Sequence, residues 1–297
     1  MPFVWGLIGF MAAGLIGIAM YRSSPARRRG HVDALILRLD IPVTDRIIGL
    51  IDRRFRDETV GVTVGGLTAL ALGSAALLAT GGQLPGGSSG YLPPLLVFAA
   101  MAIGGAVAAV RPFAAPAAPG VRVARAVTPR LSDYLNPAWV WCGVGLTVFA
   151  LGAALVAALG VGSGAGASWA PVLPLSAVFG AAASCVVALL VVVVLSRRLL
   201  AAPQPAGSEE ELRWDDALRG IALHALWLCP VALGLAASVI ALDWLLPYSP
   251  ANHWLFAVLG VLPIALFGLR LSRRSERRLW PHARGNTELP EPVPYGS

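Results

Sequence analysis

Apolar segments of membrane-spanning length are the feature that most constrains what this chain can fold into. A helix needs about 20 apolar residues to cross the hydrocarbon core of a bilayer, which is about 30 Å thick. Segments of this kind predict seven spans, at residues 3–20, 59–80, 92–110, 138–160, 171–195, 219–243 and 253–270. With 57% hydrophobic and 13% charged residues, the composition agrees with a protein embedded in lipid. We therefore expect an all-α fold, a polytopic transmembrane helix bundle.

The basic residues are distributed unevenly between the two sides of this predicted bundle. All 23 are arginine, and they lie in alternate connections: nine in 21–58, four in 111–137, four in 197–219 and six in 270–297. The positive-inside rule places these segments in the cytoplasm, with the N-terminus outside and the C-terminus inside. The lack of lysine and the excess of Ala, Gly, Val and Leu indicate a GC-rich bacterial genome, so we expect the inner membrane of a bacterium.

The predicted spans divide the chain into four parts. We expect an N-out anchor at 1–20, a cytoplasmic amphipathic connector at 21–58, a six-span bundle of three helix hairpins at 59–270 and an Arg- and Pro-rich cytoplasmic tail at 271–297. The connector has two apolar runs at helical spacing, with Pro42 between them: Val32, Leu35, Ile36 and Leu39, then Ile47, Ile48, Ile51 and Phe55. These runs predict two short helices that lie on the inner membrane surface or pack on a partner helix.

A short element precedes the second, fourth and sixth spans, as "RFRDET", "RLSDYL" and "RWDDAL". Each copy has an arginine, a bulky apolar residue, a variable residue and an aspartate: Arg54 and Asp57, Arg130 and Asp133, Arg213 and Asp216. An aspartate is favourable near a helix N-terminus, and an arginine beside lipid phosphate, so the element suits the point where a chain enters the membrane. The alternative is that the three copies form a docking surface for a membrane or cytoplasmic protein.

The motifs that suggest catalysis are incomplete. "DDALR", residues 215–219, is similar to the D-D-x-x-D element that binds magnesium and diphosphate in prenyl-transferring enzymes, but Arg219 replaces the third aspartate. "GGSSG", residues 86–90, fits G-x-S-x-G but lies between two predicted spans instead of between a strand and a helix. The absence of lysine excludes Schiff-base and P-loop chemistry, and the cysteines have no C-x-x-C spacing. We therefore predict no catalytic residue, metal site or cofactor.

Three polar residues lie in or near the predicted spans. His224 is about one turn inside the sixth span, and we expect it either to be a functional group or, more simply, a neutral histidine bonded to a neighbouring helix. Asp243 and His253 flank a short outer turn, where they form either a titrating pair or an ordinary interfacial contact.

The stretches at 39–73 ("LDIPVTDRIIGLIDRRFRDETVGVTVGGLTALALG"), "TPRLSDYLNPAW" and "WDDALRG" resemble multi-spanning membrane proteins of actinobacteria that have no assigned activity. The resemblance covers roughly residues 35–285 and implies a bacterial inner-membrane protein without a known catalytic residue. We expect a non-enzymatic accessory, scaffold or regulatory component. The alternatives are a component of a small-molecule permease or exporter and an intramembrane enzyme. Because the arginines lie beside the spans, we expect anionic lipid headgroups as partners, and no nucleic acid.

Overall fold

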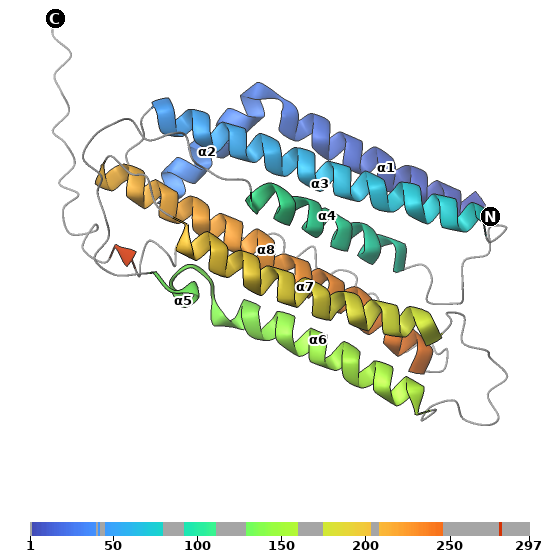
Figure 1. Cartoon of the computed structure of the whole chain (residues 1–297). Coiled ribbons are helices and arrows are strands. Elements are labelled where there is room, and N and C mark those ends of the chain that lie inside the picture. The colour runs from blue at the N-terminus through green and yellow to red at the C-terminus, as the bar shows by residue number, and fades with distance from the viewer. Residues whose placement is uncertain are drawn as a thin grey trace, which may run out of the picture.

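A computed structural model describes residues 2–39, 41, 45–79, 92–110, 129–159, 175–202, 208–245 and 279–280, and this part of the chain is helical without strands. Long helices that alternate in direction lie side by side (Figure 1). We call the end of the bundle at which α3, α6 and α8 begin the polar end, and the short helices α2 and α5 lie there. The elements are α1 (Pro2–Ser23), α2 (Pro25–Leu39), α3 (Asp45–Ala79), α4 (Leu92–Val110), α5 (Leu131–Tyr134), α6 (Pro137–Ala158), α7 (Leu175–Ala201) and α8 (Glu209–Leu245).

Within the described residues, three helices are long and apolar enough to cross a membrane: α6, α7 and α8. Shorter apolar stretches occur at Ile8–Tyr21 in α1 and Leu96–Ala109 in α4. The expectation of a helical fold is therefore confirmed for the described residues, with three helices able to cross a membrane by length and composition, while the number of about seven spans stays a prediction. The predicted span at 253–270 lies outside the described residues.

Helix α8 is the centre of the bundle. It contacts α4, α6 and α7. In its apolar 18-residue stretch 83% of the residues are buried, against 33% in that of α6 and 22% in that of α7. After its charged beginning, its sequence is apolar on all sides, which is typical of a helix buried among other helices. At 37 residues it is also about 55 Å long, longer than a hydrocarbon core of about 30 Å, so one end extends beyond an apolar layer.

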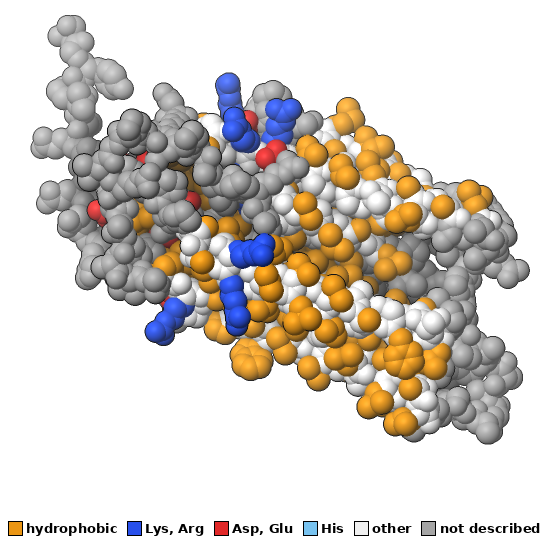
Figure 2. All heavy atoms as spheres, viewed as in Figure 1, with side chains coloured by type: hydrophobic (Ala, Val, Ile, Leu, Met, Phe, Trp, Pro, Cys, Tyr) orange, Lys and Arg blue, Asp and Glu red, His pale blue; other side chains and the backbone are white. Residues whose placement is uncertain are grey.

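The outer helices expose apolar side chains along most of their length (Figure 2). Phe10, Leu72, Trp141, Leu155 and Val187 each expose more than half of their surface. A water-soluble protein rarely exposes a continuous apolar surface of this extent, whereas a lipid-embedded bundle requires one.

Helices α3 and α4 pack backbone against backbone. A Cβ atom added to Gly61 would clash with the carbonyl oxygen of Gly104, one added to Gly104 would clash with that of Gly61, and one added to Gly65 would clash with that of Ala100. Small residues four apart allow such close approach of helices in lipid, which is the packing that the spacing of Gly61 and Gly65 indicates.

The amphipathic connector packs within the chain itself. Val32 and Leu35 of α2, with Ile47 and Ile51 of α3, form a buried cluster against Trp214 of α8. The partner of these apolar faces is therefore the first part of α8. The second apolar run of the connector is not a separate short helix, because α3 runs without interruption from Asp45 to Ala79.

Candidate functional site

The beginning of α8 carries the most concentrated group of charged side chains that the sequence analysis singled out. The hydroxyl of Ser208 accepts a hydrogen bond from the backbone N–H of Glu211, at 3.2 Å, which caps the helix. Glu209, Glu210 and Glu211 occupy its first turn, where negative charge is favoured by the helix dipole. The capped turn fixes the direction in which the next residues, Asp215 to Arg219, enter the bundle.

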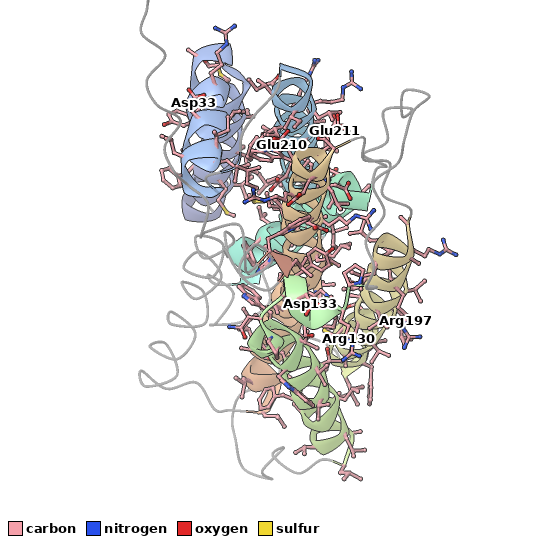
Figure 3. All side chains as sticks on the ribbon, turned by 90° about the vertical axis from the view of Figure 1, so that its left-hand side faces the viewer. Asp33, Arg130, Asp133, Arg197, Glu210 and Glu211 are labelled. Atoms are coloured by element: carbon pink, nitrogen blue, oxygen red, sulfur yellow. The ribbon has the colours of Figure 1, made fainter. Side chains whose placement is uncertain are left out.

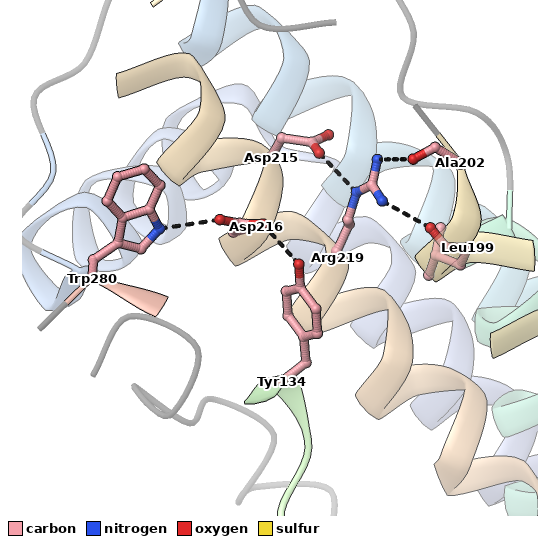
Figure 4. Close-up of polar contacts among 7 residues, drawn as sticks. All are labelled: Tyr134, Leu199, Ala202, Asp215, Asp216, Arg219 and Trp280. Carbon is pink, nitrogen blue, oxygen red and sulfur yellow. Dashed lines mark hydrogen bonds and ion pairs between the residues drawn. The ribbon is translucent and has the colours of Figure 1, made fainter. Parts of the chain in front are cut away.

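Asp216 joins three segments that are distant in the sequence (Figure 4). It is 1% exposed, and its carboxylate accepts a hydrogen bond from the hydroxyl of Tyr134 at 2.7 Å and from the indole N–H of Trp280 at 3.1 Å. The guanidinium carbon of Arg213 lies 5.9 Å from the centre of the Trp280 ring, a cation–π distance. A buried carboxylate requires such donors, because without them its desolvation is not offset.

Arg219 connects α8 to the end of α7. Its Nε atom lies 2.7 Å from the carboxylate of Asp215, and its two terminal nitrogens donate to the carbonyl oxygens of Leu199 and Ala202, both at 2.9 Å (Figure 4). The last carbonyls of a helix have no partner within the helix, so Arg219 caps α7 from a neighbouring helix. The pairing also explains why "DDALR" has an arginine where the D-D-x-x-D element has its third aspartate: Arg219 neutralises the charge of Asp215.

The described residues contain no group of three or more His, Cys, Asp or Glu side chains that could hold a metal ion. Asp215 and Asp216 are adjacent in sequence, but their partners differ: Arg219 for the first, Tyr134 and Trp280 for the second. Their carboxylates thus serve contacts between helices and segments of the chain.

Arg54 of α3 makes a related contact with the end of α4. One of its terminal nitrogens donates to the carbonyl oxygen of Ala109, in the last turn of α4, at 3.1 Å. Burial lowers the pKa of Arg54 to about 10, while the negative charges of Glu58 and Asp57 act in the opposite direction. The guanidinium therefore stays protonated at neutral pH and caps α4 as a cation.

The three copies of the repeated element lie at the same end of the molecule but in different local structures. Arg54 and Asp57 lie within α3, Arg213 and Asp216 within α8, and Arg130 and Asp133 at the short helix α5 (Figures 1 and 3). Asp133 accepts a hydrogen bond from the backbone N–H of Arg130 at 2.8 Å, which caps α5, and the side chain of Arg130 is exposed. The three copies share a sequence pattern, but their side chains make different contacts.

The polar residues in or near the spans have simpler surroundings. The Nδ1 atom of His224 lies 2.9 Å from the carbonyl oxygen of Gly220, one turn earlier in α8, and its ring meets that of Trp139 edge-on. This contact lies within α8, while the contact with Trp139 is made to α6, so a bond from His224 to a neighbouring helix stays a prediction. Asp243 belongs to the last turns of α8, with its side chain outside the described part of the structure, and His253 lies outside the described residues altogether.

Sequence analysis did not identify Arg219, Tyr134 and Trp280 as parts of this network. The only sequence signal for Arg219 is its spacing of four residues from Asp215, which suits an ion pair on a helix. Tyr134 and Trp280 are separated from Asp216 by 82 and 64 residues, and no local pattern links them to it. No family model, curated protein or solved structure matches the chain.

Proposed function

We propose that this protein is a non-enzymatic accessory or scaffold component of a bacterial inner membrane, with an arginine-rich cytoplasmic face that binds anionic lipid headgroups. The observation that carries the proposal is that the buried charged groups contact helix ends and other segments of the same chain. Arg219 and Arg54 cap the ends of α7 and α4, and Asp216 receives donors from two other segments. Charged groups engaged in this way stabilise the chain's own helix ends, which supports a structural role and not a catalytic one.

The proposed topology has about seven spans, with the N-terminus outside and the C-terminus in the cytoplasm. In support, Leu279 and Trp280 lie at the polar end, whereas Leu245, the last residue of α8, lies at the opposite end (Figure 1). Residues 246–278 therefore connect the two ends of the bundle, and the predicted span 253–270 falls inside this segment.

The proposed lipid contact rests on exposed arginines near the boundary of the apolar surface. Among the described residues, Arg53 and Arg56 of α3 and Arg197 and Arg198 of α7 are exposed within about two turns of a predicted span end. Figure 2 shows arginine side chains gathered toward one end of the apolar surface. A guanidinium at this level is placed to bind lipid phosphate.

The proposal is tested by purifying the protein in detergent and measuring its thermal unfolding with added phosphatidylglycerol or phosphatidylcholine. We expect phosphatidylglycerol to stabilise the protein more, and replacement of Arg53, Arg56, Arg197 and Arg198 by glutamine to weaken its apparent affinity by about fivefold per arginine, since each contributes roughly 1 kcal/mol. Replacement of the exposed Glu209 and Glu210 by glutamine is the charge control. Equal stabilisation by both lipids would contradict the proposal.

The permease alternative has less support. A transport path through a bundle is expected to be lined by polar groups from several helices. The buried Thr147, Ser238 and His224 instead contact the carbonyl oxygen four residues earlier in their own helices, at 2.8, 2.6 and 2.9 Å. These contacts satisfy the polar groups locally and favour the scaffold.

A further inference from the structure

Trp280 occupies a position at the polar end that the scaffold role does not explain. Its indole N–H donates to Asp216 at 3.1 Å, and its ring lies 5.9 Å from the guanidinium carbon of Arg213. The preceding residue, Leu279, packs against the apolar cluster that contains Tyr134 and Leu135. Two consecutive side chains of the C-terminal segment thus contact both the beginning of α8 and the short helix α5.

We propose that Tyr134, Arg213 and Asp216 form a binding site for an indole side chain, and that the chain's own Trp280 occupies this site as a strap across the polar end. Each member of the site matches one feature of an indole. The carboxylate of Asp216 accepts the N–H, and the guanidinium of Arg213 lies over the π face. Tyr134 holds the second oxygen of the carboxylate, which fixes its orientation.

The site does not depend on the strap alone for its order. Leu279 and Trp280, the described residues of the C-terminal segment, are both half-buried where they contact the polar end. Asp216 itself is 1% exposed and also bonded to Tyr134, so the site remains partly ordered when the indole leaves. A preformed site can exchange its occupant for a similar side chain on another segment.

Release of the strap has a defined structural consequence. Helix α5 has only four residues, and its attachment to α8 depends on the Tyr134–Asp216 bond and on the cluster that Leu279 covers. Loss of Trp280 removes a donor to Asp216 and weakens the attachment of the neighbouring Leu279 to this cluster. The segment around α5, residues 129–136, should therefore loosen together with the C-terminal segment.

The test is hydrogen exchange on the full-length protein in lipid nanodiscs. In Trp280→Ala, the backbone amides of residues 129–136 should exchange faster by on the order of fivefold. A synthetic peptide of residues 274–287, added in excess, should restore their protection, and the same peptide with alanine in place of tryptophan should not. Trp141→Ala, which removes an exposed tryptophan of α6, is the matched control and should leave exchange unchanged.

Trp280→Phe keeps an aromatic ring over Arg213 and removes the donor, so it reports on the hydrogen bond even where Trp280→Ala is too disruptive to purify. Its effect should be intermediate and should not add to that of Asp216→Asn, because both changes act on one contact. Unchanged exchange at residues 129–136 in both tryptophan variants would overturn the proposal. Restoration by the alanine peptide, or full additivity of the two substitutions, would overturn it as well.

Discussion

Arg219 shows why a single side chain of this bundle is difficult to replace. It is 3% exposed, pairs with Asp215 and donates to two carbonyl oxygens at the end of α7. Three acceptors in different directions match the fork of a guanidinium, whereas the ammonium group of a lysine is a point charge on a flexible stem. The residue therefore combines charge neutralisation with capping of another helix.

We expect Arg219→Ala to destabilise the protein by about 3–5 kcal/mol, because it leaves a carboxylate and two carbonyls without their donor. Arg219→Lys should cost less, about 1–3 kcal/mol, since one charge remains but the geometry is lost. The measurement is chemical or thermal unfolding in detergent. Arg197→Ala, at an exposed arginine of α7, is the control and should change stability by less than about 0.5 kcal/mol.

For individual residues of the site, the sequence predicts where the charged side chains lie but not which residues they contact. The pattern "RWDDALRG" indicates a polar entry to α8, and the i, i+4 spacing of Asp215 and Arg219 is readable. The contacts of Asp216 with Tyr134 and Trp280 depend on how α5 and the C-terminal segment fold back onto α8. Such contacts follow from tertiary packing, which local spacing does not encode.

Among the elements, α3 and α4 form the pair with the closest backbone contact. Gly61 and Gly65 face Gly104 and Ala100, so the interface has no room for an added methyl group. Gly73 lies farther along α3 and has nothing within 4 Å of an added Cβ. The two environments on one helix provide a matched comparison.

Gly104→Ala should destabilise the protein by about 1–3 kcal/mol, because the new methyl group forces the two backbones apart. Gly73→Ala should be neutral or stabilising by up to about 1 kcal/mol, since alanine favours the helix and meets no neighbour. Unfolding curves of both variants under one detergent condition make the comparison. Equal losses of stability in the two would show that the close contact does not control packing.

Hydropathy predicted the positions of the long helices well but not their full lengths. The predicted spans at 59–80 and 219–243 correspond to the apolar parts of α3 and α8, which begin earlier, at Asp45 and Glu209. Hydropathy identifies only the part of a helix that fits the hydrocarbon core, so a polar extension of the same helix is assigned to the connection. The extension of α8 is where the buried polar network forms.

For the whole molecule, the alternating helices and the position of Trp280 lead to a testable topology. We expect alkaline phosphatase fused after Gly87 or Gly164 to be active, because both positions lie in arginine-free connections that the positive-inside rule predicts to be outside. The same reporter after Ser297 should be inactive, and a green fluorescent protein fused there should fluoresce. An active phosphatase at the C-terminus would refute the seven-span arrangement.

The central position of α8 also sets an order for biosynthesis. A chain is made from its N-terminus, so α4, α6 and α7 are made before the helix on which they pack exists. Until α8 is made, the faces of α4, α6 and α7 that pack on it lack this partner. The bundle therefore reaches its final form only after the last third of the chain has been made.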